Sequence, residues 1–382
     1  MTSLYNLKVK GTFVSFTFLF NIMDIKKKEI SVLKSCLSGH RLSVNDALFL
    51  YKHASLAGLI QAAFKYKYQL YGKKVFYIQN VHVEPTNYCV YKCKFCSFHK
   101  EPNEQNFWED NIKQIIENIS KLPKTIKEIH ITGGVHPHRD LYWYIRLLKQ
   151  IKEIVPAAQI KAFTAIEIHY MCKKANVSIG EGLLMLKKAG LDSLAGGGAE
   201  IFNSEIRNQL CPEKGDASLW LNVHKEAHKL GIVSNATMLY GHIENMEHRI
   251  EHMAIIRALQ DETNGFNCFI PLKFRNQQNP LSEIKELPFL EDVRLFAISR
   301  LFFDTIPHIK AYWPMIGRDK AAVLLNTGAD DLDGTIYDST KIYTLAGSEE
   351  QKPMISVEDL KALILNEKFI PVERDLFYKE LS

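Results

Sequence analysis

Three of the seven cysteines lie within eight residues, at Cys89, Cys93 and Cys96 in the stretch CVYKCKFC. Structural zinc sites take four protein ligands, and no fourth cysteine lies near this stretch. A [4Fe–4S] cluster takes one ligand for each iron and is usually held by four cysteines. Three thiolates therefore indicate such a cluster with one iron left for a chelating substrate or cofactor. A zinc site completed by distant ligands, such as Cys211 with a histidine, is the alternative.

A second set of polar residues and glycines follows apolar, strand-like runs. This set consists of Gly133, Gly134, Thr164, Glu167, Gly197, Gly198, Glu200, Asn235, His242 and Arg275. Glycines let the backbone approach a ligand closely, because they carry no Cβ. Glu200 could accept hydrogen bonds from a ribose or an amine, or it could cap a helix. His242 could transfer a proton at neutral pH or be structural, and Arg275 could bind a carboxylate or lie on the surface.

Apolar runs alternate with amphipathic helical patterns along residues 76–382. The predicted strands cover residues 81–85, 127–132, 160–165, 193–197, 233–240, 266–273, 309–313 and 329–333. Helical patterns lie between them at 106–120, 141–154, 179–189, 217–230, 246–260, 290–303 and 318–326. Strands joined through helices pair in parallel, and eight of them favour a closed (β/α)8 TIM-type barrel over a doubly wound sheet. The C-terminal ends of barrel strands share one mouth, so both sets of residues are expected to converge there.

The first 75 residues precede this barrel. Residues 1–25 are predicted to be a disordered leader or an over-extended start, because the apolar stretch 12–23 has no cleavage site and is too short to span a bilayer. A membrane anchor is the alternative. Residues 26–75 show helical spacing and are predicted to form a helical extension. A net charge of +5 without a long basic run predicts no nucleic-acid partner, and scattered cysteines indicate a reducing, cytoplasmic location.

The cysteine stretch reads CX3CX2C with an aromatic residue, Phe95, before the last cysteine, and it resembles the cluster loop of the radical S-adenosylmethionine (SAM) enzymes. The resemblance implies that the three cysteines hold a [4Fe–4S] cluster whose fourth iron is chelated by SAM. It also implies that a 5′-deoxyadenosyl radical forms inside the barrel, away from water. The implied SAM-binding residues are Phe95, Phe98, Gly133, Gly134, Thr164, Glu167, Gly197, Gly198 and Glu200.

A narrower resemblance runs from about residue 26 to the C-terminus. The segments KAFTAIEI, AGLDSLAGGGAEIF, CPEK and SNATMLYGHIE are similar to the aminofutalosine synthases of the futalosine route to menaquinone. The alternative is a sibling such as the cyclic dehypoxanthine futalosine synthases, which share the cysteine loop but tend to read SP-x-K where this chain has CPEK at 211–214. Cys211 is expected to pack beside the barrel mouth and not to bind the cluster.

This resemblance implies that SAM is consumed as a co-substrate. The 5′-deoxyadenosyl radical would add to the vinyl group of 3-[(1-carboxyvinyl)oxy]benzoate, giving 6-amino-6-deoxyfutalosine, methionine and bicarbonate or CO2. Asn235, His242 and Arg275 would serve the substrate, although the loop 275–280 departs from the histidine-bearing loop of the family. An electron donor such as flavodoxin or ferredoxin would be the protein partner.

Overall fold

The computed structural model describes residues 7–9, 12–14, 16–337 and 341–381. Its centre is a parallel sheet in the order β10, β3, β4, β5, β6, β7, β8, β9. These strands are β3 (Lys74–Val83), β4 (Glu128–Ile131), β5 (Gln159–Ala162), β6 (Ser193–Leu194), β7 (Val233–Tyr240), β8 (Phe266–Lys273), β9 (His308–Ile309) and β10 (Asp331–Ile336). A parallel bridge between Lys310 and Asp331 joins the two outer strands. The strands therefore close into a ring, and the predicted (β/α)8 TIM-type barrel is confirmed.

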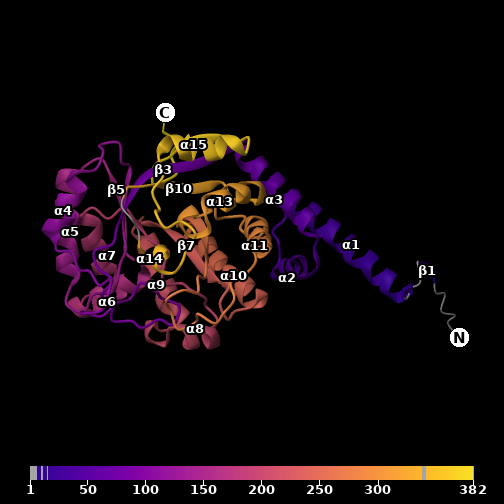
Figure 1. The fold of residues 1–382 in the computed structure, drawn as a ribbon, viewed down its shortest axis with the longest axis horizontal. Helices are drawn as coiled ribbons and strands as arrows, with labels where there is room; N and C mark the ends of the chain where they lie inside the picture. The colour runs from indigo at the N-terminus through magenta and orange to yellow at the C-terminus, as the bar shows by residue number, and fades with distance from the viewer. Residues whose placement is uncertain (1–6, 10–11, 15, 338–340, 382) are drawn as a thin grey trace.

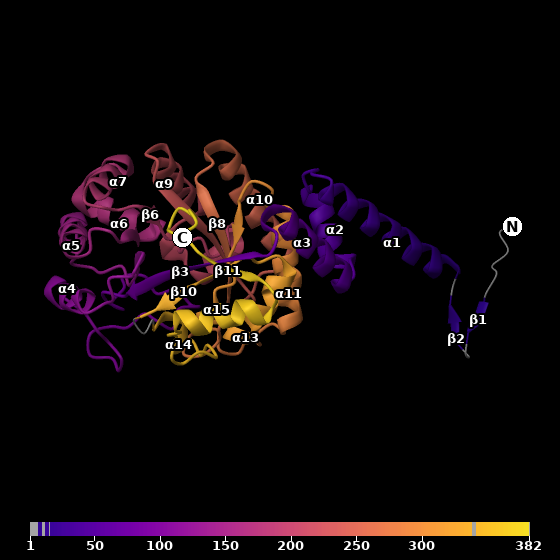
Figure 2. The ribbon, with the colours of Figure 1, turned by 90° about the horizontal axis from the view of Figure 1, so that it is seen from above.

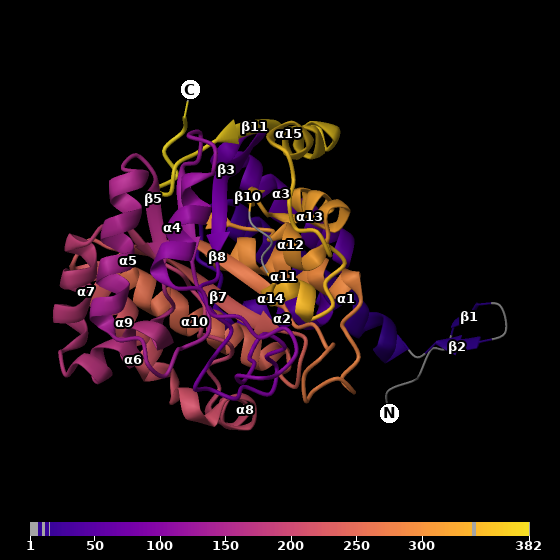
Figure 3. The ribbon, with the colours of Figure 1, turned by 60° about the vertical axis from the view of Figure 1, so that its left-hand side comes forward.

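Helices surround this ring (Figure 1; Figure 3). They are α4 (Ile112–Ser120), α5 (Leu141–Ile154), α6 (Ala165–Ala175), α7 (Ile179–Lys188), α8 (Ser204–Leu210), η1 (Pro212–Lys214), α9 (Ala217–Lys229), α10 (Met246–Thr263), α11 (Phe289–Phe302), α12 (Trp313–Ile316), α13 (Arg318–Leu324), η2 (Leu325–Thr327), α14 (Ile342–Leu345) and α15 (Val357–Asn366). Side-chain caps fix many helix starts: Asn111, Thr164 and Ser178 each complete a capping box with the residue three positions later.

Several predicted boundaries are wrong for local reasons. The first barrel strand was expected at residues 81–85 but begins at Lys74, because its N-terminal half pairs with β10 and with the C-terminal strand β11 (Ile370–Glu373). The predicted strand 160–165 ends at Ala162, since Thr164 caps α6. The predicted strand 309–313 shortens to two residues, because Trp313 already begins α12.

The N-terminal segment lies to one side of the barrel. It contains a short strand pair, β1 (Leu7–Val9) and β2 (Thr12–Val14), followed by α1 (Phe16–Leu37), α2 (Val44–His53) and α3 (Leu56–Tyr71). α2 packs on α10, α3 packs on α11, and α1 extends away from them (Figure 2). Part of the predicted leader, at residues 1–6, 10–11 and 15, falls outside the described residues, and the division at residues 25 and 75 stays a prediction. None of the helices in the described ranges has the length and apolar character needed to cross a bilayer.

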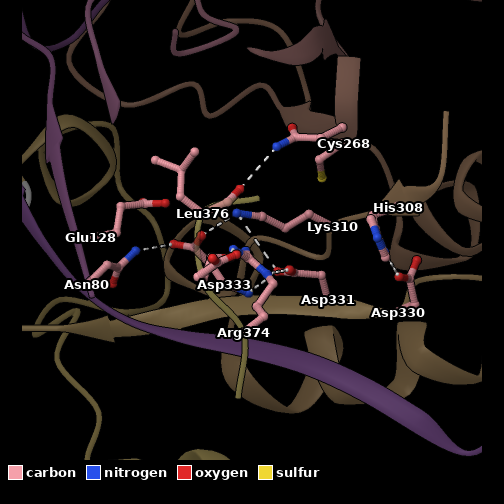
Figure 4. A network of polar contacts seen from close by, with 12 residues as sticks. Asn80, Glu128, Cys268, His308, Lys310, Asp330, Asp331, Asp333, Arg374 and Leu376 are labelled. Carbon is pink, nitrogen blue, oxygen red and sulfur yellow. Dashed lines mark hydrogen bonds and ion pairs between the residues drawn. The ribbon is translucent and has the colours of Figure 1, made fainter. Parts of the chain in front are cut away.

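A buried polar network fills the part of the barrel where β9, β10 and the C-terminal segment meet (Figure 4). The Asp331 carboxylate accepts a hydrogen bond from Arg374 at 2.6 Å, and Lys310 forms an ion pair with Asp333. Asp330 pairs with Arg300 and accepts a bond from His308. The carboxylates of the segment 330–333 therefore have protein partners.

Candidate active site

The cysteine stretch forms the loop after β3 and packs against the glycine pair that follows β4. The Gly134 N–H donates a hydrogen bond to the Thr86 carbonyl oxygen at 2.8 Å. A Cβ on Gly134 would lie 2.3 Å from the Tyr88 carbonyl oxygen, and a Cβ on Gly133 would lie 2.9 Å from the Thr86 carbonyl oxygen. The Cβ positions of both glycines thus face the backbone just before Cys89. This contact requires glycine whether or not a ligand also approaches the pair.

The CPEK segment closes over the other side of the cysteine loop. The Lys94 N–H donates to the Leu210 carbonyl oxygen at 2.9 Å, and the Lys92 N–H donates to a Glu213 carboxylate oxygen at 2.9 Å. The Cys211 side chain is buried directly after α8. Two backbone amides of the cysteine loop are therefore bound by a segment more than a hundred residues away.

The thiols experience different environments. Burial raises the pKa of Cys89 to about 12 and also raises the pKa of Cys96. A hydrogen bond with Cys211, helped by the Lys214 ammonium, lowers the pKa of Cys93 to about 7, although burial acts in the opposite direction. Cys211 lies beside the mouth as expected, and its contact with Cys93 is a feature that the sequence did not reveal.

The three thiols fit the expected cluster by their chemistry. They come from one loop of eight residues, and the charges of neighbouring cysteines act on Cys89 and Cys96. Within the described ranges, no group of three or more His, Cys, Asp or Glu side chains is arranged to hold a single metal ion. Iron binding removes the thiol protons, and three thiolates leave one iron of a [4Fe–4S] cluster for another ligand.

Glu200 and Lys214 form a buried ion pair beside the cysteine loop. The Lys214 Nζ lies 2.6 Å from the Glu200 Oε1 and 5.3 Å from the centre of the Phe95 ring. Glu200 adopts a left-handed backbone with a φ of 48°, which is costly for a residue other than glycine. Phe98 is buried and packs edge-on against Trp108 at 5.0 Å. Phe95 therefore lies at the polar side of the site, and Phe98 anchors the loop.

The glycines before Glu200 are tightly enclosed. A Cβ on Gly197 would lie 2.8 Å from the Thr164 side chain, and a Cβ on Gly198 would lie 2.6 Å from the Ile166 side chain. Gly198 also has a φ of 87°, a conformation that favours glycine. Arg207 donates hydrogen bonds to the carbonyl oxygens of this segment, including that of Gly198 at 3.1 Å. Close packing between neighbouring strand ends accounts for these glycines.

Thr164 and Glu167 bind each other at the start of α6. The Thr164 N–H donates to the Glu167 carboxylate at 2.7 Å, and the Glu167 N–H donates to the Thr164 hydroxyl oxygen at 3.3 Å. Burial raises the pKa of Glu167 to about 7, while hydrogen bonds from Thr164 and Gly133 oppose this rise. Both residues lie at the mouth, and their contact with SAM stays a prediction.

The three residues assigned to the substrate have different surroundings. Asn235 lines a cavity inside the barrel. The His242 Nδ1 lies 2.9 Å from a Glu244 carboxylate oxygen, and Arg275 forms an ion pair with Glu286 at 2.7 Å. Burial raises the pKa of Glu244, but hydrogen bonds and cationic neighbours outweigh it and lower that pKa to about 2. His242 and Arg275 lie outside the lining of the cavity, and their catalytic roles stay predictions.

The cavity has a volume of about 170 Å³ and lies at the C-terminal ends of the strands. It brings together four residues predicted from the sequence, Gly133, Thr164, Gly197 and Asn235. Sequence reasoning missed five other polar and aromatic residues of its lining, which are His82, His130, Thr237, Tyr312 and Tyr343. Alternation along the strands could show only that His82, His130 and Thr237 point inward, because every second residue of a barrel strand does so, and Tyr312 and Tyr343 lie outside the strands.

Comparison with known proteins gives two family matches. A model described as the radical SAM superfamily matches residues 83–256, and a model described as the CofH/MqnC C-terminal region matches residues 263–381. The chain is 40% identical to an aminodeoxyfutalosine synthase of Thermus thermophilus, over 92% of this chain and 95% of that protein. It is 36% identical to the aminodeoxyfutalosine synthase of Streptomyces coelicolor, over 90% and 92% of the two chains.

Two further similarities are informative. A 5-amino-6-(D-ribitylamino)uracil–L-tyrosine 4-hydroxyphenyl transferase of Methanocaldococcus jannaschii is 37% identical, over 81% of this chain and 89% of that protein. Among solved structures, methylornithine synthase (PylB) superposes with a TM-score of 0.72 at 19% identity, over 89% of this chain and 97% of that chain. At this identity the likeness concerns the fold alone.

Proposed function

Because the chain belongs to the radical SAM superfamily, in the family that contains the aminodeoxyfutalosine synthases, we propose that it joins the 5′-deoxyadenosyl group of SAM to 3-[(1-carboxyvinyl)oxy]benzoate. In the proposed reaction, SAM, this enol ether and water give 6-amino-6-deoxyfutalosine, methionine, bicarbonate and a proton. The similarity to the Thermus thermophilus enzyme along nearly the whole chain carries the proposal.

The cluster and SAM of this superfamily supply a 5′-deoxyadenosyl radical when they are bound. Cys89, Cys93 and Cys96 would hold the cluster. Lys214 orients the Glu200 carboxylate through their 2.6 Å contact, so that Glu200 could accept hydrogen bonds from the ribose or the amine of SAM. Asn235 would donate its side-chain amide to a substrate carboxylate from the cavity wall.

The cavity also explains how a reactive species would be kept from water. Ile270, Leu272 and Ala195 give part of its lining an apolar surface, and the barrel encloses it on its sides. Such a lining buries an aromatic substrate and excludes solvent.

We extend the proposal to the cellular setting. Flavodoxin or ferredoxin would supply the electron that reduces the cluster. A cytoplasmic location is supported by the cysteines, since all seven are free thiols, as reducing compartments maintain them.

The test is a single-enzyme incubation under anaerobic conditions. The reconstituted protein, SAM, dithionite and the enol ether should yield a product with the mass of 6-amino-6-deoxyfutalosine, together with methionine. The Cys96→Ala variant should yield neither product. Formation of 5′-deoxyadenosine in place of the adenosyl adduct would refute the proposal.

A second candidate function rests on the similarity to the Methanocaldococcus jannaschii transferase. If this chain had that activity, L-tyrosine and 5-amino-6-(D-ribitylamino)uracil would trigger SAM cleavage, whereas the enol ether would not. Running both substrate sets with one enzyme preparation separates the two candidates.

A further inference from the structure

Four aromatic rings line the cavity, and each ring packs against the next. The ring centres of His130 and His82 are 4.5 Å apart, and those of His82 and Tyr312 are 6.1 Å apart with an interplanar angle of 23°. Tyr343 packs against Tyr312 at 5.2 Å. We call these four residues the aromatic wall. They come from β4, β3, the segment after β9, and α14, and together they offer a surface against which an aromatic ring can pack.

Three polar atoms of the aromatic wall are buried without a partner. The Nε2 of His82, the Nε2 of His130 and the hydroxyl oxygen of Tyr312 have no hydrogen-bond partner in the part of the chain that the structure describes. Buried polar groups in folded proteins are nearly always hydrogen-bonded. Three unpaired groups on adjacent rings, all lining one cavity, therefore indicate the position of a polar group of a ligand.

The charged groups near the aromatic wall are already paired with each other. Asp333 lies 3.9 Å from the His82 Nε2, but its carboxylate is bound by Lys310 and Asn80 (Figure 4). The ammonium of Lys161 lies 2.7 Å from a carboxylate oxygen of Glu128. The two Nε2 atoms and the phenol oxygen are thus left without a bond to these charged groups, and an imidazole with its proton on Nε2, or the phenol O–H, can donate to a ligand.

Charged groups also act on the pKa values of the aromatic wall. Burial first, and then the positive charges of Lys161 and Lys310, lower the pKa of His130 well below its usual value. Burial raises the pKa of Tyr312 well above its usual value, and the carboxylates of Asp333, Glu84 and Glu128 add to this rise. The charges around the wall are therefore mixed, and a group that only accepts hydrogen bonds, such as a carboxylate, suits the donors.

We propose that the aromatic wall is the specificity subsite for an aryl carboxylate, which packs its ring on the wall and accepts hydrogen bonds from His82, His130 and Tyr312. The inference rests on the proposed function, whose substrate carries such a carboxylate on its benzene ring. The other end of the substrate then faces Gly133, Thr164 and Gly197, which line the same cavity near the cysteine loop. Because the three donors bind the carboxylate, the subsite should bind a benzoate more tightly than the same aromatic ring without a carboxylate.

The test compares two unreactive ligands on the holoenzyme with SAM bound. 3-(1-Carboxyethoxy)benzoate is the saturated form of the proposed substrate, and 2-phenoxypropanoate lacks only the ring carboxylate. Calorimetry should show that the wild type binds the benzoate at least tenfold more tightly. In Tyr312→Phe this ratio should fall by about tenfold, since one hydrogen bond to a charged group is lost. The affinity for 2-phenoxypropanoate should stay within twofold.

A matched control and a stability measurement exclude a merely structural effect. Tyr142→Phe makes the same chemical change on the exposed surface of α5, where the side chain is 47% exposed, and should leave the ratio unchanged. Tyr312→Phe removes no hydrogen bond within the described chain, so its unfolding temperature should equal or exceed that of the wild type.

Equal affinity of the wild type for the two ligands, or no measurable binding of either, would overturn the subsite. An equal loss of both affinities in Tyr312→Phe would also overturn it. These outcomes are distinct from failure of the proposed function. If the adenosyl adduct forms but the ligands are not discriminated, the subsite alone is wrong. If the ligands are discriminated but no adduct forms, the reaction alone is wrong.

Discussion

Replacing Gly134 by Ala tests whether the glycine pair is required by the cysteine loop itself. The new Cβ would lie 2.3 Å from the carbonyl oxygen of Tyr88 and 2.7 Å from its carbonyl carbon, well inside ordinary van der Waals contact, which begins near 3.4 Å. Gly134 is not among the residues with positive φ, so Ala could adopt its backbone conformation. The steric clash is therefore the main perturbation.

The clash requires the Tyr88 carbonyl to move by about 1 Å, and Tyr88 directly precedes Cys89, a proposed cluster ligand. Overpacking of this kind costs about 1–3 kcal/mol. With an unfolding entropy of about 2.1 cal/mol/K per residue, this cost lowers the unfolding temperature of the chain by about 1–4 °C. Displacement of one cluster ligand should also reduce the iron bound per chain after anaerobic reconstitution to less than about half of the wild-type amount.

Two glycine variants serve as controls for Gly134→Ala. Gly180→Ala on α7 meets only the flexible Glu226 side chain at 3.3 Å and should bind wild-type iron. In Gly133→Ala the new Cβ lies 2.9 Å from the Thr86 carbonyl oxygen, so its iron content should lie between those of Gly134→Ala and Gly180→Ala. Equal iron content and equal unfolding temperature in Gly134→Ala and Gly180→Ala would show that the cysteine loop does not require this glycine. A loss of SAM affinity with unchanged iron would show that the glycine serves the ligand instead.

Three further predictions concern the cluster and the buried charges. Replacing Cys89, Cys93 or Cys96 by Ala should abolish both the absorbance near 400 nm and turnover. Cys211→Ser should leave the iron bound per chain unchanged in a colorimetric iron assay. Because the folded pKa of Glu244 is about 2, below its usual 4.5, this carboxylate contributes about 3 kcal/mol above pH 4.5, and that contribution is lost as the pH falls towards 2. Urea unfolding of cluster-free protein between pH 6 and pH 3 should show this loss, and Glu244→Gln should flatten it. Lys310→Met should destabilise the fold by about 3–5 kcal/mol in thermal unfolding, since it leaves Asp333 buried without its cation.

The chemistry of the cysteine loop was readable from the sequence, whereas the aromatic wall was not. Cys89, Cys93 and Cys96 are close in the chain, so their spacing carries the information. His82 and Tyr312 are 230 residues apart and meet only because β3 and the segment after β9 lie in one closed ring. An inward-facing histidine on a strand has the same sequence pattern as any buried strand residue.

The strands that were predicted correctly depend on local sequence, whereas those that were predicted incorrectly depend on contacts with distant parts of the chain. The strand 233–240 and the strand 266–273 were predicted correctly, because each is a long apolar run. The strands at residues 193–194 and 308–309 are too short to carry a pattern, and neighbouring strands define them. The CPEK segment was recognised, but its contact with the cysteine loop depends on where α8 ends.

The pairing of β3 with both β4 and β11 has a consequence for the order of folding. β4 covers the C-terminal half of one edge of β3, and β11 continues the same edge from Lys74 to Tyr77. The hydrogen bond from Gln79 to Glu373 spans 294 residues of sequence. During synthesis, the first barrel strand therefore emerges early, but part of its edge stays uncovered until residues 370–373 leave the ribosome. The C-terminal segment thus covers the remaining edge of β3 last. Nascent chains that end before residue 370 expose this strand edge, which is prone to pair with other chains.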